Sequence, residues 1–181
     1  MMKLKKTLFN YLKAFFVDTD YQVIFKPNDL SQIYQNVNIN TQLAAQIYQP
    51  LKQIERHGIV IDYLIINQKT NKSIYIELKK QSGWVEGKSS AAGHGNVHER
   101  GCKLFAPGLI KLLRQKTFLD DPHFLPFVII YTGDISHDPK RVREITFWFD
   151  EFKDNYWFWI NQNDPGALKN YLFEKVLPKL I

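Results

Sequence analysis

Apolar side chains recur every three or four positions in the first part of the chain, which is the spacing of a helix. The first such series predicts an amphipathic helix over residues 4–17, with apolar positions Leu4, Leu8, Leu12, Phe15 and Phe16. A second series predicts another helix, with apolar positions Leu43, Ile47, Leu51 and Ile54. Gly58 follows this series and is a typical helix end.

The pattern then changes to short apolar runs separated by polar turns. Residues 58–66 read as a buried strand, 68–73 as a turn and 74–80 as a partner strand, so we expect a hairpin here. Residues 81–95 are rich in Gly, Ser and Ala and predict a loop, which leads into a helix over 96–105.

The second half of the chain continues the alternation of helices and strands. Pro107 and Gly108 interrupt the pattern before a further helical run. Three apolar segments predict strands, over 125–134, 144–152 and 156–162, and residues 167–181 predict a final helix. The chain has no internal repeat or long linker. We therefore expect an α/β fold in a single domain over residues 1–181, with a central mixed β-sheet flanked by helices.

Composition and charge narrow the class of protein only a little. Hydrophobic residues make up 45% of the chain and aromatic residues 14%, which indicates a globular rather than a disordered protein. Lys and Arg number 24 against 18 Asp and Glu, a formal net charge of +6 that permits a polyanionic partner. Many soluble proteins carry this much surface lysine, so charge alone does not identify the partner.

The lack of a recognisable signal peptide and the single cysteine both favour the cytoplasm. Cys102 is the single cysteine and cannot form an internal disulfide, which favours a reducing compartment. Asn10 and Lys13 interrupt the apolar run at the start, and no small-residue cleavage site follows it. No other segment approaches the roughly 18 apolar residues of a membrane span, so we expect no membrane association.

Three charged residues on the predicted hairpin suggest chemistry. Residues two apart in a strand share a face, so Glu77 and Lys79 should project together while Ile76 and Leu78 face the core. Asp62 would join them if it lies at the splayed end of the first strand. An ordinary ion pair would explain Glu77 and Lys79 without chemistry. Asp62, however, lies in an apolar run, where a buried carboxylate needs a partner or an ion.

These residues are suited to holding a magnesium ion. Mg²⁺ prefers carboxylate oxygens, a backbone carbonyl, waters and phosphate oxygens. Asp62, Glu77 and the carbonyl of Leu78 would be the protein ligands, and Lys79 would orient the attacking water and stabilise developing charge. The predicted chemistry is metal-assisted phosphodiester hydrolysis, with Asp62, Glu77 and Lys79 as the catalytic residues.

The order Asp62, Glu77, Leu78, Lys79 resembles the signature of the PD-(D/E)XK nuclease superfamily, which includes most type II restriction endonucleases. Ile61 stands where the signature has proline, a position that often varies in the superfamily. The resemblance implies a restriction-endonuclease-like fold, Mg²⁺ as cofactor and double-stranded DNA as substrate. The signature is short, and by itself it leaves recombination or repair nucleases open.

A second segment, residues 91–103, resembles the G-N-A-x-E-R-x-x-K recognition segment of the EcoRI and MunI group, with a spacing from the catalytic lysine most similar to MunI. The matching residues are Gly95, Asn96, Glu99, Arg100 and Lys103, whereas Val97 replaces the alanine. The resemblance implies major-groove contacts to the adenines of an AATT core. Asn, Arg and Glu side chains can all bond base edges. The alternative is a capped surface helix with a local Glu99–Arg100 pair.

The remaining polar residues near this segment have less defined roles. His94 stands where the MunI-like pattern has a residue that reads the outer base pair, so we expect a different flanking preference. Lys88 and Lys111 either contact phosphate or are solvated. His94, His98 and Cys102 are spaced by four, which invites a zinc site. One straight helix does not wrap three ligands around an ion easily, so this alternative is weaker.

Together these features predict a homodimeric type II restriction endonuclease that binds a palindrome and cuts one strand per subunit. A DNA-binding module without cleavage is the alternative from another class, and the intact catalytic triplet argues against it. A resolvase or repair nuclease is the third possibility, although such enzymes need no base-reading helix. The aromatic clusters of residues 147–149 and 156–160 are more typical of core or dimer contacts than of base stacking.

Overall fold

The computed structural model describes residues 1–35, 37–48, 56–83 and 98–181. A single five-stranded sheet runs through them in the order β1-β2-β3-β4-β5. The strands are β1 Tyr21–Phe25, β2 Tyr63–Asn67, β3 Ser73–Gln81, β4 Phe127–Gly133 and β5 Tyr156–Trp159. The β1–β2 and β2–β3 pairs are antiparallel, and β3–β4 and β4–β5 are parallel. The predicted mixed sheet is therefore confirmed.

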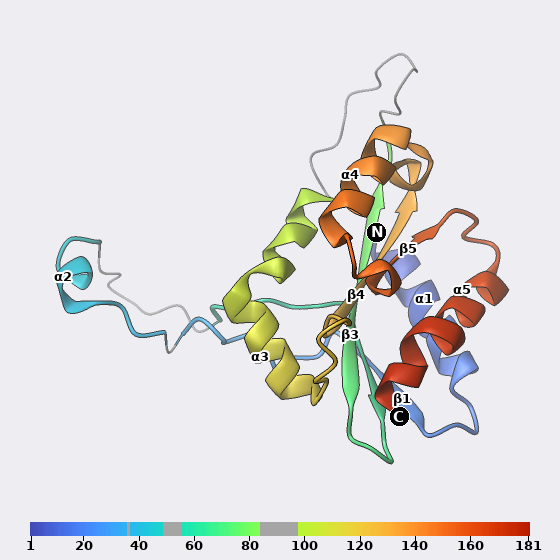
Figure 1. Cartoon of the computed structure of the whole chain (residues 1–181), viewed down its shortest axis with the longest axis horizontal. Coiled ribbons are helices and arrows are strands. Elements are labelled where there is room, and N and C mark those ends of the chain that lie inside the picture. Colours follow the sequence, from blue (N-terminus) through green and yellow to red (C-terminus); the bar gives the residue numbers. More distant parts are fainter. Residues whose placement is uncertain (36, 49–55, 84–97) are drawn as a thin grey trace.

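Helices cover both faces of this sheet (Figure 1). On one face lie α1 Met2–Phe15 and α5 Pro165–Tyr171, and on the other α3 Pro107–Thr117 and α4 Pro139–Phe149. Each face has its own core. Leu8 and Leu12 of α1 pack on Ile76 and Leu78 of β3, as predicted from their spacing. Leu113 of α3 belongs to the core of the opposite face.

The predicted hairpin forms, but its first strand is shorter than expected. β2 begins at Tyr63 rather than at Gly58, and Asp62 immediately precedes it. β1 was not predicted from the sequence, and it pairs with β2 from Tyr21↔Asn67 to Phe25↔Tyr63. β2 therefore lies between two antiparallel neighbours, β1 and β3.

The strand predicted over 144–152 is wrong, because residues 144–149 form the second half of α4. Asp138 caps the helix by accepting a hydrogen bond from the Lys140 backbone N–H at 3.1 Å, and Pro139 occupies the first turn. This is a strong helix-start signal, and it outweighs the β propensity of the aromatic run. Ile145 and Phe149, four residues apart, are the buried residues of the helix.

Other boundaries also differ from the prediction. In place of a long helix through 43–54 the structure has a short one, α2 Thr41–Ala44, and residues 49–55 lie outside the described ranges. Pro107 and Gly108 form the first turn of α3, because proline fits the start of a helix. The described part of the helix predicted over 96–105 is a 3₁₀ helix, Glu99–Phe105.

Short turns complete the chain. Two 3₁₀ turns, Asp134–His137 and Lys153–Asn155, precede α4 and β5. After α5 the chain continues through a π-helical turn, Leu172–Val176, and a 3₁₀ turn, Leu177–Leu180, so the predicted C-terminal helical segment is confirmed. Within the described ranges, no helix has the length and apolar character needed to cross a membrane.

Candidate active site

The pairing of β2 with β3 places Asp62 beside Glu77. Tyr63 pairs with Ile76 in the antiparallel register, so one step further along brings Asp62 opposite Glu77. Asp62 lies just before β2, whose pairing with β3 begins at Tyr63. Both residues are nevertheless buried, at 3% and 9% exposure. Such burial requires partners for every oxygen.

Backbone N–H groups supply half of those partners in a reciprocal arrangement. The Asp62 backbone N–H donates to Oε2 of Glu77 at 3.2 Å. The Leu78 backbone N–H donates to Oδ2 of Asp62 at 3.0 Å. Each carboxylate is therefore fixed by the strand that carries the other one, and their remaining oxygens are left for cations.

Lysines occupy those remaining oxygens. Lys79 Nζ contacts Oε1 of Glu77 at 2.6 Å, so the predicted convergence of Glu77 and Lys79 is present. Lys5 Nζ, from α1, forms an ion pair with Oδ1 of Asp62. Lys5 was not among the predicted site residues. The one sequence feature that could have indicated it is its position beside Leu4 and one turn before Leu8, at the border of the apolar face of the helix.

Tyr63 joins α1 to the same site. Its hydroxyl donates to the Lys5 carbonyl oxygen at 2.7 Å. Burial raises the pKa of Tyr63 well above the usual value for tyrosine, and the charges of Asp62 and Glu77 raise it further. The phenol is therefore a neutral hydrogen-bond donor that fixes the backbone of α1 over the carboxylates.

The donors of this site fit a hard divalent cation. Two carboxylate oxygens, Oδ1 of Asp62 and Oε1 of Glu77, contact mobile side-chain ammonium groups rather than the backbone. The Leu78 N–H points to Asp62, and the carbonyl of a strand residue points to the same side as its N–H. Carboxylates plus a carbonyl match the preference of Mg²⁺, with water or phosphate to complete the shell. In the described residues, His, Cys, Asp and Glu form no group of three or more suited to a metal.

The described part of the second predicted motif lies in the 3₁₀ helix Glu99–Phe105. Glu99, Arg100 and Lys103 are exposed, whereas Gly101 lies against β4, where a Cβ would approach Ile129 Cδ1 to 3.0 Å. Within the described residues no ion pair joins Glu99 to Arg100. The other predicted DNA-contacting residues lie outside the described ranges: Lys88, His94, Gly95 and Asn96.

His98 anchors the start of this helix to α4. Its ring is 1% exposed and stacks on Trp148 with 5.4 Å between ring centroids. Nε2 lies 3.3 Å from Glu144 Oε2 and 3.1 Å from Arg141 Nη1. Burial lowers the pKa of His98, and the Arg141 guanidinium lowers it further. The ring thus has a packing partner and polar neighbours on α4, while Cys102 of the zinc hypothesis is exposed.

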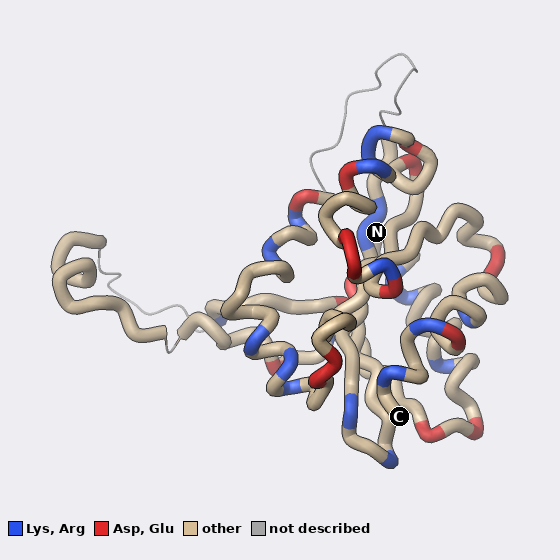
Figure 2. The backbone as a smooth tube through the Cα atoms, viewed as in Figure 1, with Lys and Arg blue, Asp and Glu red and all other residues tan. Residues whose placement is uncertain are grey.

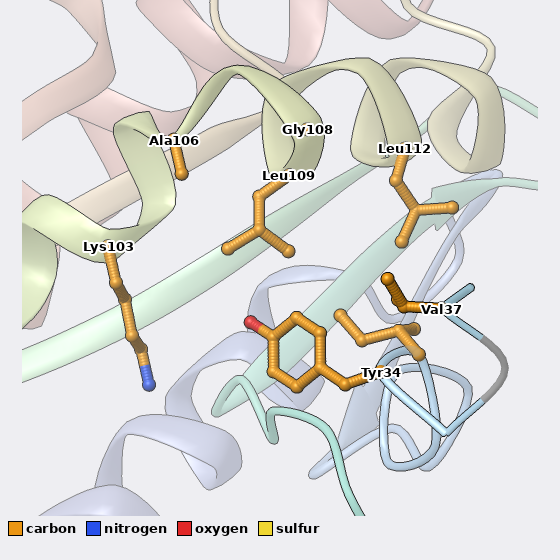
Figure 3. Close-up of a pocket in the computed structure, with 8 residues that line it drawn as sticks. Tyr34, Val37, Lys103, Ala106, Gly108, Leu109 and Leu112 are labelled. Atoms are coloured by element: carbon orange, nitrogen blue, oxygen red, sulfur yellow. The ribbon is translucent and has the colours of Figure 1, made fainter. Parts of the chain in front are cut away.

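Lys103 lines a pocket of about 380 Å³ between the start of α3 and the segment that follows β1. Tyr34 and Val37 form one wall and Leu109 and Leu112 the other, with Lys103 at one end (Figure 3). The lining is mostly apolar, so the pocket does not itself resemble a phosphate site.

Positive charge does not single out one surface. Lys and Arg are distributed over α1, α3 and α4 (Figure 2). Lys111 of α3 is exposed, which is compatible with either a phosphate contact or a solvated side chain. The active-site geometry is therefore more informative than the charge distribution.

Comparison with known proteins covers the whole chain. The family model described as type II restriction enzyme MunI matches residues 1–181. The type II restriction enzyme MunI of Mycoplasma sp is 41% identical over 174 residues, which is 95% of this chain and 86% of the relative. A crystal structure of MunI restriction endonuclease in complex with cognate DNA matches with a TM-score of 0.88 and 40% identity, over 96% of this chain and 89% of that one. The chain therefore belongs to the MunI family of type II restriction enzymes.

Proposed function

We propose that this restriction endonuclease hydrolyses double-stranded DNA with Mg²⁺ at a short palindrome that contains an AATT core. The observation that carries the proposal is the reciprocal hydrogen bonding of Asp62 and Glu77, which fixes two buried carboxylates side by side. Burying two like charges together is costly unless cations balance them. In this structure Lys5 and Lys79 balance the two carboxylates, and a divalent cation could take their place at the same oxygens.

The proposed mechanism assigns each residue a separate task. Asp62, Glu77 and the Leu78 carbonyl would hold the ion. When bound, Mg²⁺ would polarise the scissile phosphate and lower the pKa of the attacking water. Lys79 would leave Glu77 to orient that water and to donate to the phosphate oxygen on which charge develops. The Lys79 Nζ is close enough to reach a water or phosphate at the metal site, because it already contacts the Glu77 carboxylate.

The proposed specificity rests on Asn96, Glu99 and Arg100. Their order matches the segment that in the EcoRI and MunI group reads an AATT core, and the matched MunI structure is a complex with cognate DNA. The exposure of Glu99 and Arg100 on the 3₁₀ helix supports a role in contacting DNA. His94 departs from the pattern, so the base pair flanking the core is expected to differ.

Phage DNA incubated with the purified protein and Mg²⁺ should yield discrete fragments with a common end sequence. A site-specific enzyme cuts only where its base contacts are satisfied, so sequencing the fragment ends gives the site and the cut position. The control omits Mg²⁺ and contains EDTA. Binding without any cleavage would instead favour the DNA-binding module, and cleavage confined to branched substrates would favour a resolvase.

The enzyme is expected to be a homodimer, because a palindrome presents two identical half-sites and each chain carries one catalytic centre. Residues 37–48, which contain α2, project away from the sheet (Figure 1) and leave large apolar side chains exposed, among them Ile39, Leu43 and Tyr48. Apolar surface of this kind favours burial against a partner. Sedimentation velocity should give the mass of a dimer, free and on DNA. A monomer in both states would contradict the dimer and would indicate a nicking enzyme.

A further inference from the structure

Lys5 is an additional cation at the active site that the predicted catalytic set does not use. It lies 57 positions before Asp62 in the sequence, and its side chain is 18% exposed beside a carboxylate that is 4% exposed. An ammonium group at this depth pays a desolvation cost that a surface lysine avoids. The ion pair with Asp62 is the contact that offsets this cost.

The fold holds Lys5 in place through α1. Leu8 and Leu12 of the same helix are fully buried on the sheet, and the Tyr63 hydroxyl donates to the Lys5 carbonyl at 2.7 Å. Tyr63 is the residue that follows Asp62. The backbone of Lys5 and that of Asp62 are therefore tied together, and only the lysine side chain is free to change partner.

The oxygen that Lys5 occupies is the one that a metal ion requires. Oδ2 of Asp62 accepts the hydrogen bond from the Leu78 backbone, which fixes the strand pair. Oδ1 is the other oxygen, and it contacts Lys5 Nζ. Glu77 has the same division, with Oε2 on the Asp62 backbone and Oε1 on Lys79. A divalent cation held by Asp62 and Glu77 at these oxygens would have to displace both ammonium groups.

We propose that Lys5 is a positioning residue that competes with the divalent cation for Asp62 and so couples metal uptake to the arrival of DNA. This inference rests on the metal site of the proposed function. Two ammonium groups balance two carboxylates in the metal-free site, so a divalent cation added alone leaves the site positive. A DNA phosphate carries one negative charge, so it lowers this excess and offers the displaced Lys5 a new charge-assisted partner.

Direct titration with Mn²⁺, followed by electron paramagnetic resonance of the free ion, tests this coupling. In the absence of DNA, Lys5→Met should bind Mn²⁺ about threefold to tenfold more tightly than wild type, because a partly buried competing ion pair is removed. A duplex with phosphorothioate linkages, which keep the negative charge and slow cleavage, should strengthen Mn²⁺ binding strongly in wild type and less in Lys5→Met.

Two matched variants separate this effect from general charge loss and from misfolding. Lys6→Met removes the same charge from the next, exposed residue of α1 and should leave Mn²⁺ affinity near that of wild type. Lys5→Arg keeps the charge and should restore weak DNA-free binding, which a merely structural defect would not do. Circular dichroism checks that all variants are folded.

The outcomes distinguish the inference from the function on which it rests. Equal or weaker Mn²⁺ binding by folded Lys5→Met, with binding still abolished by Asp62→Asn, would overturn the role of Lys5 and leave the metal site standing. Absence of Mn²⁺ binding in wild type, with and without DNA, would overturn both. Tighter binding in Lys5→Met that Lys5→Arg reverses supports the competition.

Discussion

Replacing Asp62 by asparagine, or Glu77 by glutamine, should lower the rate of DNA cleavage on the order of a thousandfold, because a lost metal ligand forfeits several kcal/mol of charge stabilisation. The amide oxygen of either substitute can still accept the backbone hydrogen bond that Asp62 Oδ2 or Glu77 Oε2 now accepts. The fold should therefore survive while the charge that holds the metal is lost. Single-turnover cleavage of a labelled duplex measures the effect.

Asp20→Asn is the matched control for these variants. Asp20 pairs with Lys69 at 2.8 Å on the surface, where both side chains are largely exposed, so the same loss of charge should leave cleavage unchanged. Thermal denaturation of all three variants tests folding. Cleavage at the wild-type rate by folded Asp62→Asn would rule out the proposed centre, and a similar loss in Asp20→Asn would indicate a nonspecific effect of charge.

Much of the candidate catalytic centre was predictable because it is local in sequence. Glu77 and Lys79 share one strand, and the period of two places them on one face. The tight turn between β2 and β3 then fixes the register that brings Asp62 opposite Glu77. Lys5 was not predictable in the same way. Its approach to Asp62 depends on how α1 crosses the sheet, and no short-range pattern encodes that crossing.

The errors in secondary structure arose where two local signals compete. The aromatic run of residues 144–152 has high β propensity, but the Asp138 cap and Pro139 begin a helix that carries the chain through it. β1 was missed because its five residues lack a clear alternation of buried and exposed positions. Its pairing with β2, which is non-local, stabilises the strand instead.

The proposed recognition segment shows a different limit, since its described residues Glu99, Arg100 and Lys103 are polar and exposed. Glu99 and Arg100 do not face a core, so hydrophobic periodicity carries little information about them, and they were identified through a family resemblance. The fold explains how they are presented. His98 is packed against Trp148 of α4, and Gly101 approaches β4 closely. The exposed residues Glu99 and Arg100 lie between these two packed residues in the sequence.

Arg100→Ala should weaken binding of cognate DNA by about 1–3 kcal/mol, the usual value of a bidentate base contact, and should affect random DNA much less. The difference in binding affinity between cognate and random DNA should therefore become smaller. Lys88→Ala is the comparison variant, since a lost phosphate contact should weaken binding to both sequences alike and reduce the dependence on salt. Competition binding in Ca²⁺, at one fixed salt concentration, measures both affinities.

Cleavage across oligonucleotides with AATT and varied flanks, beside controls that lack AATT, completes the test of specificity. Because Asn96, Glu99 and Arg100 match the AATT-reading pattern and His94 does not, substituting His94 should change the preference at the flanking pair and leave the core requirement intact. Efficient cutting of sequences without AATT would contradict the proposed readout. The proposed catalytic centre would be unaffected by that result, because Asp62, Glu77 and Lys79 are proposed to act on the phosphodiester and not on the bases.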